Sequence, residues 1–403
     1  MHKLRIGVFL DKSYRPSVGG GFSYAEQLIQ FLDEYPFDER LELFFISEDI
    51  HHKGFKKKLM VMPSHELESK AWTFTDKWKY KWATLFSNEE KKRVVIQTVR
   101  ERTSLAKRNW LLSQSIDLVY YTHPTNHPPD VPYIMTHWDL GHRTIFPFPE
   151  IAEEGNFSKR IQFHSNYLAK AFAIFAESEQ SKDELIQYER IHPDRIFVVP
   201  LFPGKVAQLN VAEAQQKEIL EKWKLKKGQY FYYPAQYWAH KNHFVLIEAF
   251  SKIAQIQPQA KLIFSGSDKG NKRYLQDIAL QLGIQDRIIF EGFISNEEVY
   301  SLYKNAAALV MPTFLGPTNM PLLEARDIGC PIICSDLSGH RRQMQNDARY
   351  FSPTDTQALA SLLTEAIIDY TPRNASSKNY KESTCKLIEA HLLHLLPIRK
   401  TWK

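Results

Sequence analysis

Hydrophobic residues in the first half of the chain form short runs that are separated by amphipathic stretches. Residues 4–10 (LRIGVFL) are an apolar run of strand length, and a glycine loop then opens a helical pattern. The apolar positions of that pattern are Phe22, Ala25, Leu28, Ile29 and Leu32. Further strands are predicted at 41–47, 116–121, 131–136, 172–178 and 195–204. Strands that alternate with helices indicate βαβ units and a parallel sheet that helices cover on both faces.

The same alternation begins again in the second half of the chain. A polar, charged stretch at 211–229 precedes new apolar runs, and a helix is predicted at 243–256. The predicted strands are 230–236, 260–267, 287–293, 307–313 and 331–336. We therefore predict an α/β protein with two doubly wound parallel sheets in tandem. Such sheets bind ligands at the carboxyl ends of their strands, so we expect a cleft between the two domains.

We place the domain border near residue 205. The N-terminal domain then spans residues 1–205, and the C-terminal domain spans residues 206–385. We expect the last segment, 386–403, to be a helix that packs back on the N-terminal domain. A chain of 403 residues is too long for one ordinary hydrophobic core, which supports two domains of about 150–200 residues.

The composition, with 43% hydrophobic and 24% charged residues, is typical of a soluble globular protein. No apolar run reaches the length of about 18–20 residues that a membrane-spanning helix needs. Asp11 interrupts the apolar run at the N-terminus, so we interpret this run as a buried strand and not as a signal peptide. Cys330, Cys334 and Cys385 lack a metal-binding spacing, which favours reduced thiols in a cytoplasmic protein.

The positive charge of the chain is concentrated in segment 51–110. This segment has fifteen Lys and Arg against six Asp and Glu, a net charge of +9, whereas the whole chain carries +6. Within it, residues 70–82 (KAWTFTDKWKYKW) alternate aromatic residues with lysines. A period of two favours a half-buried strand or hairpin over a helix that lies on a membrane. A basic, aromatic rim that binds anionic lipid is the functional alternative, which we favour. Nucleic acid is a third alternative, without a supporting motif in the sequence.

Three glycines, Gly19, Gly20 and Gly21, follow the first strand and open a helix. Exposed N–H groups at such a helix start form an anion site, although a tight strand-to-helix turn needs the same residues. The dinucleotide fingerprint G-x-G-x-x-G is incomplete, because Tyr24 occupies the place of its last glycine. Lys241 follows the first strand of the second domain near a helix start, where either a phosphate or solvent could be its partner.

The segment FLGPTNMPLLEA, residues 314–325, joins a stiff polar loop to an apolar helix that carries one acid. Pro317 and Asn319 shape the loop, and we expect the N–H groups of Asn319 and Met320 to point into the cleft. An acid without a partner is costly on an apolar helix, so Glu324 is predicted to bind a ligand hydroxyl. The alternative is a favourable interaction of Glu324 with the helix dipole. Together with the lysine and the glycines, this segment predicts a ligand with phosphate and sugar groups.

Four stretches of the chain resemble the retaining glycosyltransferases of family 4, which have the GT-B fold. These stretches are GGGFSYAEQL, YYPAQYWAHKNHFVLIEAF, IIFEGFISNEEVYSLYKNAAALVMPT and GPTNMPLLEA. The resemblance implies two Rossmann-like domains that face a central cleft. It also implies transfer of a hexose or deoxyhexose from a nucleoside-diphosphate sugar to a growing, lipid-linked glycan. The GPTN loop, with WDLGHRTIFPFPE and ESEQSKDEL, resembles a subgroup that acts on bacterial envelope polysaccharides such as O-antigen, capsule and lipopolysaccharide.

The resemblance also implies roles for single residues. Lys241 matches the family's phosphate-binding lysine, and Gln236 stands where an arginine is usual. Glu324 matches the second Glu of the E-x7-E motif, which binds the ribose, whereas the first Glu falls on Gly316. The donor-binding residues implied in this way are Gly19, Gly20, Gly21, Gln236, Lys241, Gly266, Phe293, Gly316, Thr318, Asn319, Met320 and Glu324.

The acceptor side is expected in the first domain, where MTHWDLGHR (135–143) follows a buried strand. The family's His-Asp pair falls on Trp138 and Asp139, so His137 or His142 could take over the role of the histidine. The alternatives are a helix cap for Asp139 and an exposed loop position for His142. The implied catalytic residues are Lys241, Asp139, His142 and His137.

No metal or other cofactor is expected, because the sequence has no Asp-x-Asp motif or histidine cluster and the GT-B fold needs no metal. The expected partners are the nucleotide-sugar donor, a glycan or lipid-linked oligosaccharide acceptor, and an anionic membrane surface contacted by segment 51–110; nucleic acid is not expected. The expected location is cytoplasmic and peripheral on the inner face of the membrane. Two other classes stay open: another GT-B sugar-nucleotide enzyme, such as an epimerase, and a transferase-like subunit that binds without catalysis.

Overall fold

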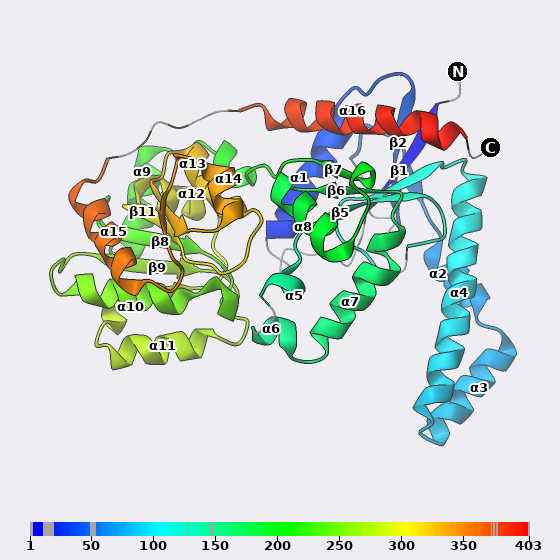
Figure 1. The fold of residues 1–403 in the computed structure, drawn as a ribbon, viewed down its shortest axis with the longest axis horizontal. Helices are drawn as coiled ribbons and strands as arrows, with labels where there is room; N and C mark the ends of the chain where they lie inside the picture. The colour runs from blue at the N-terminus through cyan, green and yellow to red at the C-terminus, as the bar shows by residue number, and fades with distance from the viewer. Residues whose placement is uncertain are drawn as a thin grey trace.

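The structure, a computed structural model, describes residues 3–10, 20–48, 54–126, 128–145, 148–371, 373, 375 and 378–401. Its strands form two parallel sheets, and helices cover each sheet to give two domains (Figure 1). The predicted α/β architecture with two doubly wound sheets is therefore confirmed.

The N-terminal sheet has seven strands in the order β3-β2-β1-β4-β5-β6-β7. Ile6 of the central strand pairs with Leu43 on one side and with Leu118 on the other. The strands are β1 (Leu4–Leu10), β2 (Leu41–Ser47), β3 (Leu59–Val61), β4 (Leu118–Tyr121), β5 (Tyr133–His137), β6 (Ala173–Ala176) and β7 (Ile196–Val198). The helices are α1 (Gly20–Glu34), α2 (Ser64–Ala71), α3 (Phe74–Leu85), α4 (Glu89–Ser113), α5 (Gly141–Thr144), α6 (Pro149–Ala152), α7 (Asn156–Asn166) and α8 (Glu179–Glu189), with 3₁₀ turns η2 (Leu168–Lys170) and η3 (Pro193–Arg195).

The C-terminal sheet has six strands in the order β10-β9-β8-β11-β12-β13. These are β8 (Tyr230–Pro234), β9 (Lys261–Ser265), β10 (Ile288–Glu291), β11 (Ala308–Met311), β12 (Ile332–Ser335) and β13 (Arg349–Phe351). The helices are α9 (Glu213–Lys222), α10 (His243–Ala254), α11 (Lys272–Gln281), α12 (Asn296–Asn305), α13 (Met320–Ile328), α14 (Ser338–Met344) and α15 (Thr356–Ile368), with 3₁₀ turns η4 (Lys205–Gln208), η5 (Ala239–Lys241) and η6 (Gln285–Arg287).

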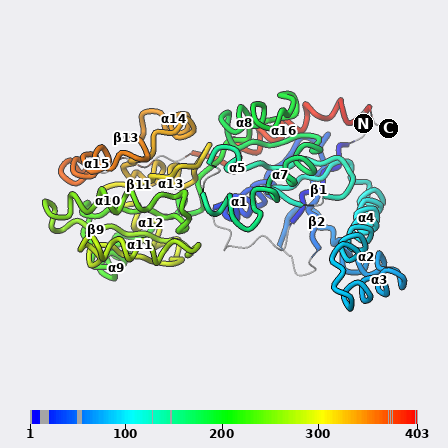
Figure 2. The backbone as a smooth tube through the Cα atoms, turned by 60° about the horizontal axis from the view of Figure 1, so that its bottom comes forward, coloured from blue at the N-terminus to red at the C-terminus, as the bar shows by residue number. Residues whose placement is uncertain are grey.

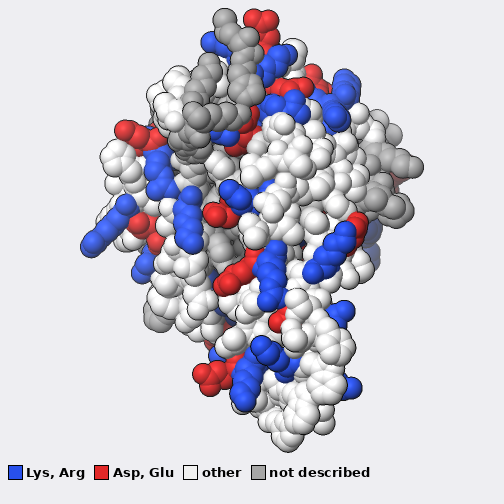
Figure 3. Space-filling model, turned by 90° about the vertical axis from the view of Figure 1, so that its right-hand side faces the viewer, with Lys and Arg blue, Asp and Glu red and all other residues white. Residues whose placement is uncertain are grey.

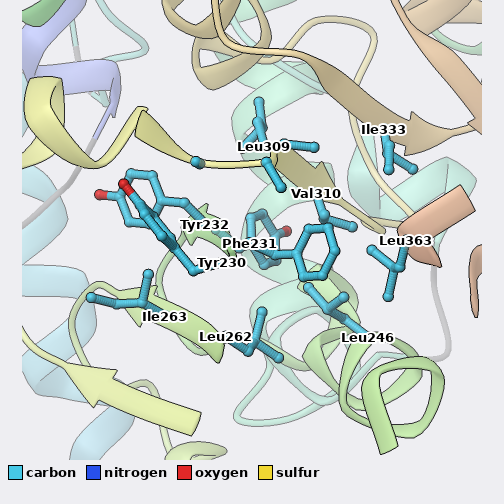
Figure 4. Packing of buried hydrophobic residues seen from close by; sticks show 14 of the residues in the cluster. Tyr230, Phe231, Tyr232, Leu246, Leu262, Ile263, Leu309, Val310, Ile333 and Leu363 are labelled. Atoms are coloured by element: carbon cyan, nitrogen blue, oxygen red, sulfur yellow. The ribbon is translucent and has the colours of Figure 1, made fainter. Parts of the chain in front are cut away.

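The C-terminal core forms because its strands are apolar on both faces. Tyr230, Phe231 and Tyr232 of β8 are fully buried, and Figure 4 shows them among Leu262 of β9 and Leu309 of β11. An apolar run of this kind is typical of a parallel strand that helices cover on both sides. The packing fixes the carboxyl end of β8, from which η5 and α10 begin.

The last helix, α16 (Tyr380–Lys400), returns to the N-terminal domain (Figure 1). Cys385, Ile388 and Leu392 are buried in the same core cluster as Ile6 of β1. Arg399 Nη2 also binds Asp117 Oδ1 at 2.9 Å. The helix begins six residues before the predicted position 386.

Helices α2, α3 and α4 form an arm that extends away from the N-terminal sheet (Figures 1 and 2). The predicted strand or hairpin at 70–82 is therefore wrong. A capping box starts α3: the Thr73 side chain accepts the N–H of Asp76, and the Asp76 carboxylate accepts the N–H of Thr73. Aromatic residues at Phe74, Trp78 and Trp82 are four positions apart, a spacing that fits a helix as well as a strand.

The sequence analysis also missed two strands. β3 and β13 each have three residues and lie at the edges of their sheets. Edge strands of this length give no recognisable apolar run. Among the described helices, none combines the length and the apolar character that a bilayer crossing requires.

Candidate functional site

Lys241 ends the short turn η5 that follows strand β8. Asn242 next to it adopts a left-handed conformation with φ 56°, and α10 begins at His243. The Lys241 Nζ donates to Asn319 Oδ1 at 3.5 Å, so the structure brings together two predicted site residues from distant parts of the chain. Burial lowers the pKa of Lys241 to about 8, although the negative charges of Asp139 and Glu150 oppose this shift.

The loop before α13 is fixed by its own amide and by α14. Asn319 Nδ2 lies 2.9 Å from the Nε2 atom of His340, and the Asn319 N–H donates to Gln343 Oε1 at 3.0 Å. The expectation that this N–H is directed to a ligand in the cleft is therefore not met in this structure, because Gln343 already accepts it. Gly316 has φ 153°, and a Cβ there would collide with the side chain of Asn319, so the loop requires glycine at this position.

Glu324 lies one turn into α13 and is only partly accessible to solvent. The Tyr303 hydroxyl donates to its Oε2 at 3.0 Å, and the N–H of Gly204 also donates to the carboxylate. Burial nevertheless raises the pKa of Glu324 to about 7. The acid is thus held by one residue of its own domain and by one residue of the connection between the domains.

The other predicted donor-binding residues follow strands of the C-terminal sheet or open α1. Gln236 follows β8 and accepts a hydrogen bond from Trp238 Nε1 at 2.9 Å. Gly266 follows β9 with φ 158°, and it packs so closely on Ala235 that a side chain would collide with backbone. Phe293 follows β10 and is 64% exposed. Gly20 and Gly21 open α1, whereas Gly19 lies outside the described residues.

On the N-terminal side, Asp139 follows β5. Its Oδ1 accepts the N–H of Gly141 at 2.7 Å and binds Arg160 Nη1 at 2.9 Å. The predicted alternative of a helix cap is not met, because the N-cap of α5 is Leu140. Although burial raises the pKa of Asp139, Arg160 and the Gly141 N–H lower it to about 2. Asp139 is therefore a carboxylate at every physiological pH.

The two predicted histidines lie in the interior of the N-terminal domain. His137, in β5, has its Nδ1 3.1 Å from Ser181 Oγ, and His142 is 1% exposed. The alternative of an exposed loop position for His142 is therefore wrong. Burial lowers the pKa of His137 and of His142 to about 4, so both imidazoles are neutral at pH 7.

A histidine cluster that the sequence analysis did not expect surrounds His142. Ligand atoms of His142, His164 and Glu189 lie within 4.8 Å of one another, which is the only group of metal-binding type among the described residues. Two histidines and a glutamate match the donors of many zinc sites. The carboxylate is already in an ion pair with Arg143 Nε at 3.1 Å.

Side chains of the two domains meet directly beside Lys241. Glu150, in α6, accepts the N–H of His240 at 2.9 Å and also bonds its imidazole. Thr318 donates to Glu177 Oε1 at 3.4 Å across the same interface, and burial raises the pKa of Glu177 well above its ordinary value. A pocket of about 150 Å³ between the domains is lined by Thr144, Gln180, Glu184, Phe314, Leu315, Gly316, Pro317, Leu337, Ser338 and Gly339. The described residues of the two domains thus touch beside Lys241, and a small pocket lies between the domains at the Gly316 loop.

Sequence reasoning missed Glu150, Glu177, His240 and Tyr303. The first two lie inside the quoted stretches WDLGHRTIFPFPE and ESEQSKDEL, which gave their only signal. His240 directly precedes Lys241 in the sequence, but its contact with Glu150 arises only in the folded chain. Tyr303 lies 21 residues before Glu324 and reaches it only in the folded chain.

A larger pocket of about 520 Å³ opens on the N-terminal domain between α1 and residues 54–56. Its described lining combines the carboxylates of Glu26, Asp33 and Glu34 with the amines of Lys56 and Lys205. Because apolar side chains such as Phe22, Ile29 and Phe55 also line it, the pocket suits a small molecule with both polar and apolar surface.

Residues 215–383 match the family model described as "Glycosyl transferases group 1". This part of the chain is a glycosyl transferases group 1 domain. It contains Lys241, the Gly316 loop and Glu324, so the prediction of a glycosyltransferase domain is confirmed. The match covers the C-terminal domain and not the N-terminal sheet.

Several curated glycosyltransferases are similar to parts of this chain. The uncharacterized glycosyltransferase MJ1607 of Methanocaldococcus jannaschii is 37% identical over 95 residues, 23% of this chain and 24% of that protein. The serotype-specific mannosyltransferase WbdA of Escherichia coli is 24% identical over 216 residues, 52% of this chain and 26% of that protein. The O-antigen chain mannosyltransferase B of Escherichia coli is 22% identical over 227 residues, 56% of this chain and 59% of that protein. The matches thus span about a quarter to three fifths of these relatives.

Solved glycosyltransferase structures are similar to the whole chain. Sucrose-phosphate synthase from Thermosynechococcus elongatus has a TM-score of 0.64 at 15% identity and covers 99% of both chains. Anabaena Alr3699/HepE in complex with UDP-glucose has a TM-score of 0.62 at 15% identity and covers 97% of this chain and 99% of its own. The predicted GT-B fold is therefore confirmed.

Proposed function

We propose that this protein is a retaining glycosyltransferase that moves a hexose or deoxyhexose from a nucleoside-diphosphate sugar to a growing glycan of the cell envelope. The observation that carries the proposal is the contact of Lys241 with Asn319, at the start of the helix that carries Glu324, inside the group 1 domain. A cation, a glycine loop and a held carboxylate are the groups that a diphosphate and a ribose require.

Relatives and structural neighbours support the chemical class of the substrates. The curated relatives include mannosyltransferases of O-antigen chains, and a neighbour of the same fold was solved with UDP-glucose. We therefore propose a hexosyl donor, with mannosyl and glucosyl nucleotides as the first candidates. The position of the first family Glu is Gly316 here, so recognition of the sugar must use other groups.

In the proposed reaction the bond from the sugar carbon to the β-phosphate oxygen breaks while the acceptor oxygen bonds that carbon. Attack from the face of the leaving group retains the configuration, and the acceptor proton passes to the departing phosphate. Lys241 would stabilise the charge that develops on this phosphate, which is the largest effect a preorganised site offers. Glu324 would bind the ribose hydroxyls, with Tyr303 and Gly204 holding it in place. These steps use only groups of the chain and the nucleotide, and we propose no metal or other cofactor for them.

We assign the acceptor to the N-terminal domain, as predicted for Asp139, His137 and His142. Asp139 is ionised and partly exposed, so it would orient an acceptor hydroxyl without first losing a proton. His137 and His142 are neutral but only 1% exposed each, so an acceptor would reach them only after a rearrangement. The 520 Å³ pocket beside α1 offers room for a sugar of the acceptor. We further propose a lipid-linked oligosaccharide as acceptor, with the enzyme peripheral on the inner face of the membrane.

Release of nucleoside diphosphate tests the proposal. The protein is mixed with a panel of nucleotide sugars that includes GDP-mannose and UDP-glucose, with and without candidate oligosaccharide acceptors. Stimulation by one donor and acceptor pair supports a transferase, and the anomeric configuration of the product tests retention. A donor that raises the melting temperature but is never consumed would instead favour the binding subunit that lacks catalysis.

A further inference from the structure

The arm of helices α2, α3 and α4 carries apolar side chains that its own packing does not use. On α3 and the turn after it, the exposed fractions are 76% for Phe74, 52% for Trp78, 52% for Trp82, 69% for Leu85 and 69% for Phe86. Large apolar residues exposed singly are ordinary, but contiguous ones mark a binding surface. Figure 3 shows the free end of the arm as an uncharged surface with basic side chains beside it.

Four of these residues form one continuous ridge along α3. Phe74, Trp78, Trp82 and Phe86 are each four positions apart, so they lie on one side of the helix. Ring centroids are 6.4 Å apart for the first two pairs and 5.4 Å apart for Trp82 and Phe86. We call these four residues the aromatic ridge. It is a stacked row of rings, of which the last two pairs lie nearly parallel.

The opposite side of α3 fastens the helix to the rest of the arm. Ala83 and Asp76 are buried, and the Asp76 carboxylate bonds both Thr73 and Arg102 of α4. These contacts fix the helix and its orientation, so the ridge points outward because the other face is already occupied.

Basic side chains stand beside the ridge on the same helix. Lys77, Lys79 and Lys81 are exposed, and none of them makes an ion pair with a residue that the structure describes. The only acid of α3, Asp76, is neutralised by Arg102. The exposed surface of this helix is therefore aromatic and cationic, without a compensating carboxylate.

We infer that the aromatic ridge enters the interface of an anionic lipid bilayer and that the lysines bind the headgroups around it. Tryptophan prefers the boundary between headgroups and acyl chains, because its ring is apolar and its N–H remains hydrogen-bonded there. Each lysine adds attraction to an anionic surface. A protein partner with an apolar groove would satisfy the rings but would need acidic residues for every lysine, so the charge pattern favours the membrane.

The role of this membrane contact rests on the proposed function, because an arm bound to the membrane would bring the enzyme to a lipid-linked acceptor. It replaces the sequence-based picture of alternating lysines and aromatics on a strand. Phe74, Trp78 and Trp82, which were expected to alternate with lysines along a strand, instead form a row along a helix. The contact surface is then the free end of the arm rather than all of segment 51–110.

The test is vesicle sedimentation with the full chain, using vesicles of phosphatidylglycerol mixed with phosphatidylcholine and vesicles of phosphatidylcholine alone. One variant, Trp78→Ser with Trp82→Ser, removes the centre of the aromatic ridge. A second variant, Lys77→Gln with Lys79→Gln and Lys81→Gln, removes the positive charges beside it. Matched controls in the C-terminal domain are Tyr274→Ser with Ile256→Ser, and Lys224→Gln with Lys226→Gln and Lys227→Gln, all at exposed positions. Circular dichroism verifies that each variant is folded.

We expect the wild type to bind anionic vesicles, to bind neutral vesicles far less, and to lose affinity as salt increases. The lysine variant should bind the anionic vesicles about a hundredfold more weakly at low salt, since each lysine contributes about fivefold. The tryptophan variant should lose binding even at low salt, and both controls should match the wild type. Tryptophan fluorescence of the wild type should shift to shorter wavelength on vesicles, and this shift should disappear in the tryptophan variant.

Absence of binding by the wild type, or equal binding by the arm variants and the controls, overturns the inference. Dimerisation of the wild type that the tryptophan variant abolishes, without vesicle binding, would also overturn it and assign the ridge to a second copy of the chain. Release of nucleoside diphosphate with a short soluble acceptor is measured in parallel. If the protein binds vesicles but consumes no donor, the proposed function is refuted and membrane binding by the arm stands. If it consumes a donor but does not bind vesicles, only membrane binding by the arm is refuted.

Discussion

The Tyr303 hydroxyl donates to the Glu324 carboxylate at 3.0 Å, and this hydrogen bond joins helix α12 to helix α13. The N–H of Gly204 reaches the same carboxylate from the connection between the domains. The acid on the apolar helix therefore has partners within the protein, but they offset the cost of burying its charge only in part, because the pKa of Glu324 still rises to about 7. These partners also aim the carboxylate, so a ligand that binds it would meet a prearranged group.

Replacement of Glu324 by Gln should change how stability depends on pH. Burial raises the pKa of Glu324 from 4.5 to about 7, so the folded protein binds this proton more tightly than the unfolded chain. The stabilisation is complete below pH 4.5 and is lost as the pH rises through 7. Glu324→Gln should remove this loss, and its free energy of unfolding relative to the wild type should rise by about 2–3 kcal/mol between pH 4.5 and pH 8. Denaturant unfolding at both pH values measures the free energy of unfolding of each protein. If the difference between variant and wild type is the same at both pH values, the pKa of Glu324 is not raised in the folded protein.

The same substitution should weaken nucleotide binding more than it slows the reaction. A ribose contact is present in the ground state and in the transition state alike, so its loss raises KM while kcat changes little. Calorimetric titration with nucleoside diphosphate measures the affinity directly. Tyr303→Phe is the matched control, because it leaves the carboxylate in place and removes one of its partners. Unchanged affinity in Glu324→Gln would restrict this acid to the helix-dipole role.

Gly204→Ala should disturb the site without disturbing the backbone. Gly204 has φ −64°, which any residue adopts, but a Cβ there would collide with the Glu324 carboxylate and would lie 3.2 Å from Met320 Sδ. The carboxylate must therefore turn away, and we expect nucleoside diphosphate to bind about tenfold more weakly in a folded protein. Gly292→Ala is the control, since a Cβ there meets nothing within 4 Å. Equal affinities of the two variants would show that the position of Glu324 does not matter for binding.

The positions of most strands along the chain were predictable, because burial on both faces leaves continuous apolar runs. The runs at 41–47 and 230–236 became β2 and β8 with little change, whereas the run at 195–204 yielded only Ile196–Val198 before the chain leaves the sheet. The arm was not predictable from periodicity. Aromatic residues four positions apart satisfy a period of two and a helix alike, and only the capping box at Thr73 decides between them.

A role could be predicted for a residue only where the local sequence carries a motif. Resemblance to a family gave Lys241 and Glu324 their hypothetical roles. The contacts that hold these residues, such as Gly204 with Glu324 and Glu150 with His240, join separate domains and leave no local pattern. For the same reason the sequence did not predict that Gln343 occupies the N–H of Asn319.

Asp139→Asn should separate an acceptor role from a structural one. Asp139 is in a partly exposed ion pair with Arg160, a type of contact worth about 1 kcal/mol or less, so the variant should stay folded. As a residue that orients the acceptor, its loss should lower kcat by about two orders of magnitude while nucleoside diphosphate binds as in the wild type. Steady-state kinetics at saturating donor measures kcat, and calorimetry measures the affinity for nucleoside diphosphate. A fall in affinity, or full activity, would remove Asp139 from the acceptor side.

Lys241 offers the sharpest test, because its charge can be changed by pH as well as by substitution. Lys241→Ala should lower turnover by about two to three orders of magnitude if the ammonium stabilises the departing phosphate, and retention of more than about half the activity would refute this role.

Burial lowers the pKa of Lys241 to about 8, so the free protein loses this cation as the pH rises from 7 to 9. A nucleoside diphosphate keeps its charge over that range, since its last phosphate ionisation lies near pH 6. The affinity of the wild type for nucleoside diphosphate should therefore fall about tenfold between pH 7 and pH 9, which calorimetry can follow. Lys241→Gln should bind weakly and with no such change, because the variant has no ammonium to lose. A parallel fall in both proteins would place the titrating group elsewhere in the cleft.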